Sequence, residues 1–310
     1  MAYPSFISDN STVINISSSW PRITGIRKIV IFSCSTYDSG DSYSSVGYQG
    51  PGSEKAPCAA KPLGVDFPGN SLLMWNEHGT PNWVGHLITK YTPEPRYKPD
   101  VDEQDEGYTD NPILVYDYAV GGSTIDGVKH QVGSFFLGPN GVGTKPDWAH
   151  WSPEETLFVT WVGINDCAWS KDHDQAMTML FNLQEQLYHA GARNFLFIDV
   201  PPISRSPAAA NASHKDPEFG RTYQNWNDKL RSGVVSFARQ SHIDTSVFLF
   251  SAYATFNNFL DNYKEYGFTE IDISKPFGRI WCDHLHPTSK VHDIVAFDLF
   301  NFLSSVPRKS

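Results

Sequence analysis

Short apolar runs that alternate with helical stretches constrain the fold of this chain more than any other feature of its sequence. The runs are rich in β-branched and aromatic residues and are nearly continuous, without alternation of polarity. Such runs are typical of strands that are buried on both faces of a parallel sheet. They cover residues 26–33, 112–120, 157–163, 194–200 and 246–252.

Three further stretches have the spacing of amphipathic helices. Apolar residues recur every three or four positions over 176–190, and Gly191 follows where a helix C-cap is expected. A second stripe covers 223–237, and a third helix is predicted from residue 288 or 289 to about 302. Strands that alternate with helices predict an α/β fold, with a doubly wound parallel sheet between two layers of helices.

The domain organisation follows from the same pattern. No break in composition divides the chain, so we expect a single domain over residues 26–305, preceded by an N-terminal extension over 1–25. Two long surface insertions are expected near 40–70 and 91–112. Because ligands bind beyond the carboxyl ends of the strands in such sheets, residues that follow the strands are candidates for a functional site.

Charge and hydropathy limit the partners of this chain. Its 310 residues include 24 basic and 34 acidic side chains, for a net charge of −10, and no basic patch occurs. Nucleic-acid phosphates would be repelled, so we expect no nucleic-acid partner. No apolar run reaches the roughly 18–20 residues that a membrane helix needs, so we expect no membrane partner either.

The N-terminus and the sequons bear on the cellular compartment. Residues 1–20 lack the basic start and the apolar core of a secretory signal, which favours an intracellular protein. Three N-x-S/T sequons, at Asn10, Asn15 and Asn211, would matter only in a secreted protein. A secreted form from which a signal has been removed therefore stays open.

Four short polar segments fall at the expected strand ends or before the last helix. They contain Ser35, the Gly121-Gly122 pair, Asn165 within Gly-Ile-Asn-Asp, and an Asp-x-x-His pair formed by Asp283 and His286. Together they supply a hydroxyl, a backbone N–H, an amide side chain, and a histidine with an acidic partner. Acyl transfer needs these groups: a nucleophile, a base with an orienting acid, and donors for the oxyanion.

These segments, in this order, resemble the SGNH/GDSL hydrolase superfamily, particularly the fungal GDSL acetylesterases grouped with carbohydrate esterases. The resemblance implies a flavodoxin-like sheet, no cofactor or metal, and serine esterase activity on short acyl esters, such as acetyl groups on a carbohydrate or small molecule. It assigns Ser35 as the nucleophile and Asp283 and His286 as acid and base. The oxyanion hole would consist of Ser35, Gly122 and Asn165, whereas the neighbouring Asp166 is interpreted as structural.

One departure from the family pattern affects the first segment. The family reads Gly-Asp-Ser there, whereas this chain reads Ser33-Cys34-Ser35. Ser33 adds a side chain at a tight turn, and Cys34 replaces a carboxylate that can accept hydrogen bonds from the backbone. We interpret Cys34 as a small buried residue and not as a thiol nucleophile. Two alternatives stay open: a catalytically degraded binding protein, and an acyltransferase on the same site.

Two further interpretations concern metals and aromatic side chains. The segment around Asp283, His284 and His286, with His292, has spacing that permits a metal site, although no C-x-x-C or Glu-x-x-His pair supports it. Tryptophans beside the motifs either stack on a substrate or pack in the core. They are Trp75, Trp83, Trp161, Trp169 and Trp281.

Overall fold

A six-stranded sheet forms the centre of the protein. The computed structural model describes residues 3–4, 6, 8, 10–33, 43–48, 50, 52–209, 218–239 and 244–309. Across the sheet the strand order is β1-β6-β5-β4-β2-β3. The strands are β1 (Thr12–Asn15), β2 (Lys28–Ser33), β3 (Leu114–Asp117), β4 (Thr156–Trp161), β5 (Asn194–Ile198) and β6 (Ser246–Phe250).

The five strands predicted from the apolar runs are confirmed, and they are parallel. β2 pairs with both β3 and β4, β4 pairs with β5, and β5 pairs with β6. All residues of β4, β5 and β6 are buried, as expected where helices cover both faces of a parallel sheet. The register brings Ser33, the last residue of β2, opposite Trp161, the last residue of β4.

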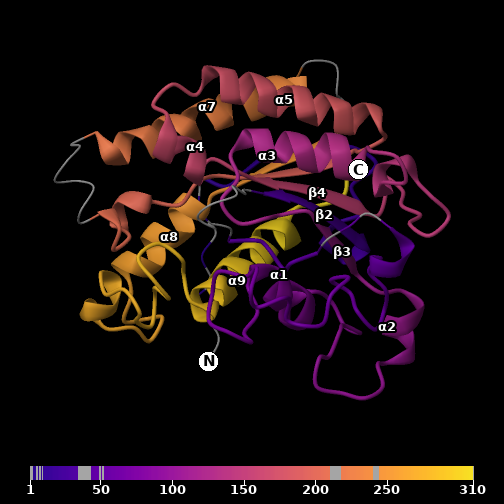
Figure 1. The fold of residues 1–310 in the computed structure, drawn as a ribbon, viewed down its shortest axis with the longest axis horizontal. Coiled ribbons are helices and arrows are strands. Elements are labelled where there is room, and N and C mark those ends of the chain that lie inside the picture. The colour runs from indigo at the N-terminus through magenta and orange to yellow at the C-terminus, as the bar shows by residue number, and fades with distance from the viewer. Residues whose placement is uncertain are drawn as a thin grey trace.

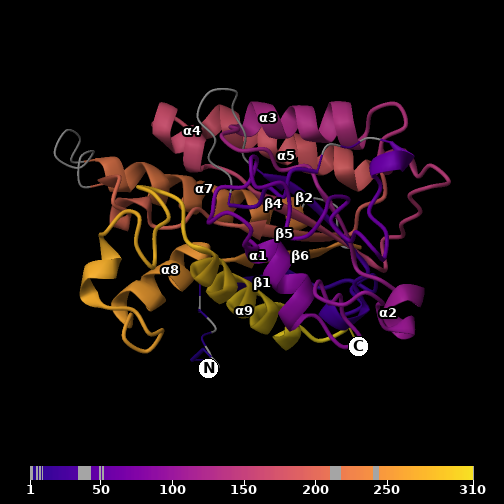
Figure 2. The same cartoon turned by 60° about the horizontal axis from the view of Figure 1, so that its bottom comes forward.

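Helices cover the sheet on both faces, so the predicted α/β architecture of three layers is confirmed (Figures 1 and 2). One layer contains α3 (Ile125–His130), α4 (Ile164–Trp169), α5 (Asp174–His189) and α7 (Phe219–Arg239). The other contains α1 (Trp83–His86), α8 (Ala252–Asp261) and α9 (Ser289–Ser305). Both views place these two groups on opposite sides of the strands.

The long helices agree with their apolar stripes. α5, α7 and α9 coincide with the three predicted helices, and Thr288 occupies the N-cap of α9. Gly191 has a φ of +108°, a conformation that favours glycine, directly after the end of α5.

The remaining helices were not predicted, because elements of four to ten residues are too short to show a stripe. Short elements include α2 (Glu106–Asp110), two π-helical turns (Leu87–Tyr91 and Gln131–Phe136), and 3-10 turns at Ile23–Gly25, Ser53–Lys55, Val142–Thr144, Ile203–Arg205 and Glu270–Ile273.

Part of the predicted N-terminal extension belongs to the sheet. β1 pairs antiparallel with β6 and forms the edge of the sheet, which is therefore mixed. β1 has only four residues, and its side chains are partly exposed, so the sequence contains no apolar run that marks it. None of the helices in the described part of the chain is long and apolar enough to span a membrane.

Candidate active site

The side chains of Asp283 and His286 are in direct contact. Nδ1 of His286 lies 2.5 Å from Oδ2 of Asp283. The other carboxylate oxygen, Oδ1, accepts hydrogen bonds from the backbone N–H groups of Leu285 at 2.6 Å and His286 at 2.7 Å. Asp283 therefore both binds the imidazole ring and fixes the turn that carries it.

The protonation of this pair follows from its geometry. Burial raises the pKa of Asp283, but the hydrogen bonds from the side chain and backbone of His286 outweigh this effect and hold the pKa below its usual value. The carboxylate is therefore ionised at neutral pH and can only accept, so Nδ1 of His286 carries the hydrogen. In the neutral imidazole, this tautomer leaves the lone pair on Nε2, the nitrogen that acts as a base.

The loop that carries the pair is held at both ends. Trp281 and Pro287 form an isolated β-bridge, and the backbone N–H of Cys282 donates to the carbonyl of His286 at 2.9 Å. The hydroxyl of Tyr43 donates to the carbonyl of Leu285 at 2.9 Å. His286 itself is only 3% exposed. A base whose rotamer and backbone are both constrained is positioned before any substrate binds.

Tyr43 connects His286 to the carboxyl edge of the sheet. Its ring lies 6.1 Å from the ring of His286 and 5.6 Å from the indole of Trp161, the last residue of β4. The carbonyl of Trp161 accepts a hydrogen bond of 2.6 Å from the hydroxyl of Ser33. The imidazole thus lies at the edge of the sheet where β2 and β4 end. No sequence signal marked Tyr43, because a loop tyrosine has no periodic neighbours.

The candidate nucleophile Ser35 and its neighbour Cys34 lie outside the described residues. Ser33, which precedes them, is buried and fully engaged. Its N–H donates to Oε1 of Gln131 at 3.0 Å, and its carbonyl accepts from Nε2 of Gln131 at 2.6 Å. The side chain that replaces the family's glycine therefore fits between β2 and β4, where its hydroxyl joins the two strand ends.

The two candidate oxyanion residues outside the first segment lie close together. Nδ2 of Asn165 donates to the carbonyl of Ser123, the neighbour of Gly122, at 3.0 Å. This bond uses one of the two N–H groups of the amide and leaves the other as a donor. Gly122 has a φ of +85°, which a glycine adopts without strain.

A glycine also determines how the chain leaves β4. Gly163 has a φ of +129°, and a Cβ at this position would overlap the indole of Trp226. Only glycine fits this conformation and this space. The turn leads directly into α4, which carries Asn165 and Asp166.

The exposure of the five tryptophans separates packing from possible ligand contact. Trp83, Trp161 and Trp281 are buried in the core. By contrast, Trp75 is 37% exposed and Trp169 is 77% exposed. The Trp75 ring lies 5.3 Å from that of His286, with an interplanar angle of 30°. Trp75 thus forms a wall beside the candidate base, which sequence alone did not reveal.

A second Ser–His–Asp set joins α1 to α9. Nε2 of His86 lies 2.9 Å from both the hydroxyl and the carbonyl of Ser289, and Nδ1 lies 3.5 Å from Asp293. The hydroxyl of Ser289 donates to the carbonyl of Pro81 at 2.6 Å, so its hydrogen is not directed at His86. Burial lowers the pKa of His86 to about 4 despite the nearby Asp293. This neutral ring is an interhelical link and does not activate Ser289.

The metal interpretation of the Asp-x-x-His segment finds no support in the geometry. Across the described ranges, no three His, Cys, Asp or Glu side chains are grouped closely enough to hold a metal ion. His292 is instead buried at 6.0 Å from the ring of Tyr43. Cys58, Cys167 and Cys282 are free thiols, and Cys34 lies outside the described residues.

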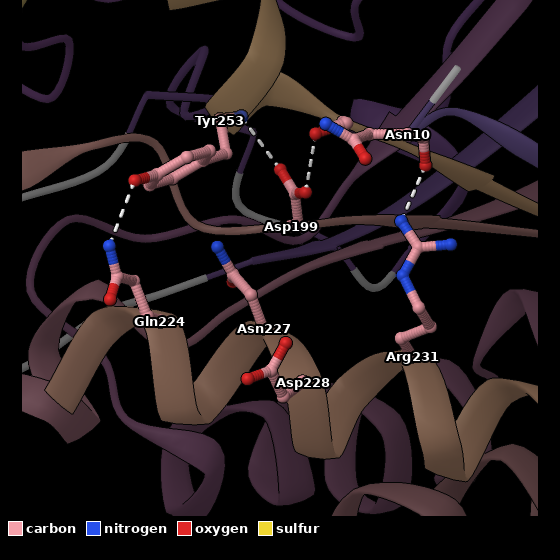
Figure 3. A pocket seen from close by; sticks show the side chains of 8 residues that line it. Asn10, Asp199, Gln224, Asn227, Asp228, Arg231 and Tyr253 are labelled. Carbon is pink, nitrogen blue, oxygen red and sulfur yellow. Dashed lines mark hydrogen bonds between the residues drawn. The ribbon is translucent and has the colours of Figure 1, made fainter. Parts of the chain in front are cut away.

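A polar cavity of about 300 Å³ lies at the ends of β5 and β6, where Asp199 is buried (Figure 3). Both oxygens of Asp199 are engaged: Oδ2 accepts from the hydroxyl of Ser251 at 2.6 Å and Oδ1 from the N–H of Tyr253 at 2.8 Å. Arg231 reaches across the cavity and donates to the carbonyl of Asn10. This cavity is therefore braced internally and does not contain the candidate catalytic pair.

The mixed sheet of five parallel strands and one antiparallel edge strand, with helices on both faces and an Asp–His pair at the carboxyl edge, is the architecture of an α/β hydrolase-like enzyme. The chain belongs to the GDSL-like Lipase/Acylhydrolase family, whose model matches residues 40–299. The match begins after Ser35. The chain is accordingly a carboxylic ester hydrolase.

Similar proteins agree with this family. An acetylesterase of Thermothelomyces thermophilus is 30% identical over 287 residues, which cover 83% of this chain and 84% of the relative. A GDSL esterase/lipase of Arabidopsis thaliana is 33% identical over 92 residues, 28% of this chain and 23% of that protein. Among solved structures, a single-residue variant of an acetyl xylan esterase from Geobacillus stearothermophilus matches with a TM-score of 0.51 and 14% identity, over 93% of this chain and all of that one. At this identity the structural match supports the fold alone.

Proposed function

We propose that this chain hydrolyses short-chain esters, acetyl esters first, through an acyl-serine intermediate. The geometry of Asp283 and His286 carries the proposal: an ionised carboxylate 2.5 Å from Nδ1 leaves Nε2 as the base. The preference for acetyl groups is supported by the fungal relative, which is an acetylesterase. Ser35 is proposed as the nucleophile from the family resemblance.

The proposed reaction has two half-reactions. Nε2 of His286 takes the proton from Ser35, whose Oγ attacks the ester carbonyl, and Asp283 stabilises the imidazolium that forms. The backbone N–H groups of Ser35 and Gly122 and the amide of Asn165 donate to the oxyanion. His286 then protonates the departing alcohol. Water, deprotonated by the same nitrogen, attacks the acyl-serine and releases the acid, and the proton returns to Ser35.

A fluorophosphonate probe tests the nucleophile, because it phosphonylates only an activated serine. We expect peptide mass spectrometry to locate the label on Ser35, and the Ser35→Ala variant to lose both labelling and turnover of p-nitrophenyl acetate. Ser289→Ala is the matched control, since Ser289 also lies beside a histidine but donates elsewhere. It should be labelled like the wild type. Labelling of Ser289, or retained activity in Ser35→Ala, would contradict the proposal.

Defined substrates test two properties: the preferred length of the acyl chain, and whether water or another alcohol accepts the acyl group. For p-nitrophenyl esters, kcat/KM should fall at least about tenfold from acetate to octanoate, because loss of a fitted pocket costs at least about 1.4 kcal/mol. NMR should detect free acetate as the product, even with glycerol present as a competing alcohol. Acetylated glycerol as the main product would indicate an acyltransferase. An unlabelled protein without turnover would indicate a binding protein.

A further inference from the structure

The indole of Trp75 lies against the imidazole of His286, a contact that the proposed reaction does not use. The centroids of the two rings are 5.3 Å apart, and their planes are inclined by 30°. Tyr43 also contacts this imidazole, at 6.1 Å, but there the planes are inclined by 65°. The planes of Trp75 and His286 are thus closer to parallel than to perpendicular, so the imidazole is stacked with an offset on the π face of the indole.

The segment that carries Trp75 is bound to the elements on both sides of the candidate base. The backbone carbonyl of Trp75 accepts from the thiol of Cys282, the residue before the Asp–His pair, with an Sγ–O distance of 3.6 Å. Two residues further on, Oε2 of Glu77 accepts a hydrogen bond of 2.6 Å from the N–H of Ser289, the first residue of α9. The place of the indole beside His286 is therefore fixed by the protein itself.

The two stacked rings differ in their exposure to solvent. His286 is 3% exposed and Trp75 is 37% exposed, so the indole covers the imidazole and keeps part of its own surface in water. An imidazolium in this place has lost most of its hydration, and its charge needs other partners. Asp283 supplies one partner, 2.5 Å from Nδ1. The indole face supplies a second, because the ring quadrupole attracts a cation within about 6 Å of the centroid.

The other titratable groups near the imidazole do not provide a second partner of this kind. Burial lowers the pKa of His292, in α9, to about 3, so this ring is neutral at neutral pH. Burial raises the pKa of the Cys282 thiol to about 12, with a further contribution from the charge of Glu77, so the thiol is neutral as well. The hydroxyl of Tyr43 donates to a backbone carbonyl.

We propose that Trp75 is a positioning residue for the candidate base: its indole face holds the imidazole of His286 and stabilises its protonated form. The attraction arises only when the ring is charged, so it favours the transition state, in which the imidazolium forms, over the ground state. No bond is made or broken at Trp75. The effect on catalysis rests on the proposed esterase function, whereas the effect on the basicity of His286 does not.

A pH titration of the free protein, followed by NMR at the Cε1–H of the imidazole, measures the pKa of His286 without substrate. The signal that is missing in His286→Gln assigns the resonance. Trp75→Leu keeps an apolar cover on the ring, so the imidazole stays shielded from water and only the π face is lost. We expect the pKa of His286 to fall by about half a unit to one unit in Trp75→Leu. The fall should be smaller in Trp75→Phe, which keeps an aromatic face.

Phe277→Leu is the matched control. Phe277 is an aromatic side chain that is 71% exposed, and it contacts the neighbouring ring of His284 at an interplanar angle of 89°. Its loss should leave the pKa of His286 unchanged. Circular dichroism of each variant shows whether the fold is retained.

Steady-state kinetics with p-nitrophenyl acetate give the effect on the reaction. Trp75→Leu should lower the plateau value of kcat by about three- to tenfold with little change in KM. The acid limb of the kcat/KM profile should move to lower pH by the shift measured by NMR, because a weaker base stays unprotonated at lower pH. If Trp75 were only a wall for the substrate, KM would rise, and the pKa and the acid limb would stay in place.

Two results would overturn the proposal: a pKa of His286 in Trp75→Leu that equals or exceeds the wild-type value, or a shift of the same size in Phe277→Leu. The NMR titration needs neither a substrate nor an active nucleophile. A protein without labelling or turnover would therefore refute the esterase proposal and leave the pKa comparison valid.

Discussion

The carboxyl ends of β4 and β5 are neighbours in the sheet, yet the buried aspartates near them are held in different ways. Asp199 follows β5 and receives hydrogen bonds at both oxygens, from Ser251 and from the backbone of Tyr253. Asp166, in α4 after β4, receives one at Oδ1, and its Oδ2 has no partner among the described residues. Burial raises the pKa of both, to about 7 for Asp199 and about 6 for Asp166.

The comparison teaches that burial and strand-end position alone do not define a functional group in this fold. At β5 the protein satisfies its own carboxylate, so the region acts as a brace between the sheet, α7 and α8. Near β4 an amide donor, an incompletely bonded carboxylate and an exposed indole lie close together. What distinguishes the β4 side from the β5 side is therefore how completely the buried carboxylate is hydrogen-bonded, and not its burial or its position after a strand.

The largest expected effect is on catalytic activity. It separates the Asp283–His286 pair, which lies where β2 and β4 end, from Asp199, which follows β5. Asp283→Asn should lower kcat for p-nitrophenyl acetate by about 10³–10⁴-fold, because the amide no longer holds Nδ1 of His286 as the protonated nitrogen. Asp199→Asn should change kcat by less than about threefold, because Asp199 lies away from the candidate pair and serves as a brace. Steady-state kinetics on both purified variants provide the test. Similar losses of kcat in the two variants would show that the β5 end also serves catalysis.

The next effect concerns the turn that leaves β4. Gly163→Ala should lower the free energy of unfolding by about 3 kcal/mol, because it adds both backbone strain and overlap with Trp226. Gly52→Ala is the matched control: Gly52 has a φ of +132° but no atom within 4 Å of an added Cβ. Gly52→Ala should lower the free energy of unfolding by only about 1 kcal/mol, because it adds backbone strain without overlap. Urea denaturation measures the free energy of unfolding of both variants. Equal losses of stability would show that the protein relieves the overlap with Trp226.

A third test compares the aspartates directly by stability at a mildly alkaline pH. Asp199→Ala leaves the hydroxyl of Ser251 and the N–H of Tyr253 without their acceptor, which should cost about 2 kcal/mol. Asp166→Ala leaves only the N–H of Ile125, and it removes a poorly solvated charge, so the net change should be below about 1 kcal/mol. The midpoints of urea denaturation, at unchanged m-values, give the stability loss of each variant. A larger loss for Asp166→Ala than for Asp199→Ala would contradict the prediction.

A last test sharpens the same comparison through the pH dependence of stability. A carboxyl whose pKa is raised on folding binds its proton more tightly in the native state, so native stability falls as pH rises between the unfolded and the folded pKa. For Asp166 this window runs from the usual 3.8 to about 6, and for Asp199 from 3.8 to about 7. Asp166→Asn should therefore gain about 2 kcal/mol relative to the wild type as pH rises from about 4 to about 6.5. A constant difference across this range would contradict the raised pKa.

Local periodicity explains why much of the fold was predictable. The five parallel strands and the helices α5, α7 and α9 each carry their signal within one segment, and the structure confirms them. β1 carries no such signal, because an edge strand of four residues gains its stability from its partner β6. The short helices α3 and α8 are likewise determined by what they pack against.

The candidate site shows the same division. The contact between Asp283 and His286 spans three residues, so their spacing in the sequence already brought them within reach. The bridge that Tyr43 forms between Trp161 and His286 joins three distant segments, and nothing local predicts it. The roles of Ser35, Gly122 and Asn165 stay predictions that the labelling and kinetic experiments address.

By itself, the sequence determined the five parallel strands and the three long helices, their layered α/β arrangement, and which family's motifs the chain carries, because apolar spacing and short motifs are local features of the sequence. Only the tertiary structure decided which of two buried aspartates receives a full set of donors, and which two of five tryptophans remain exposed. Hydrogen-bond saturation and exposure depend on groups that distant segments bring together, and no single segment encodes them.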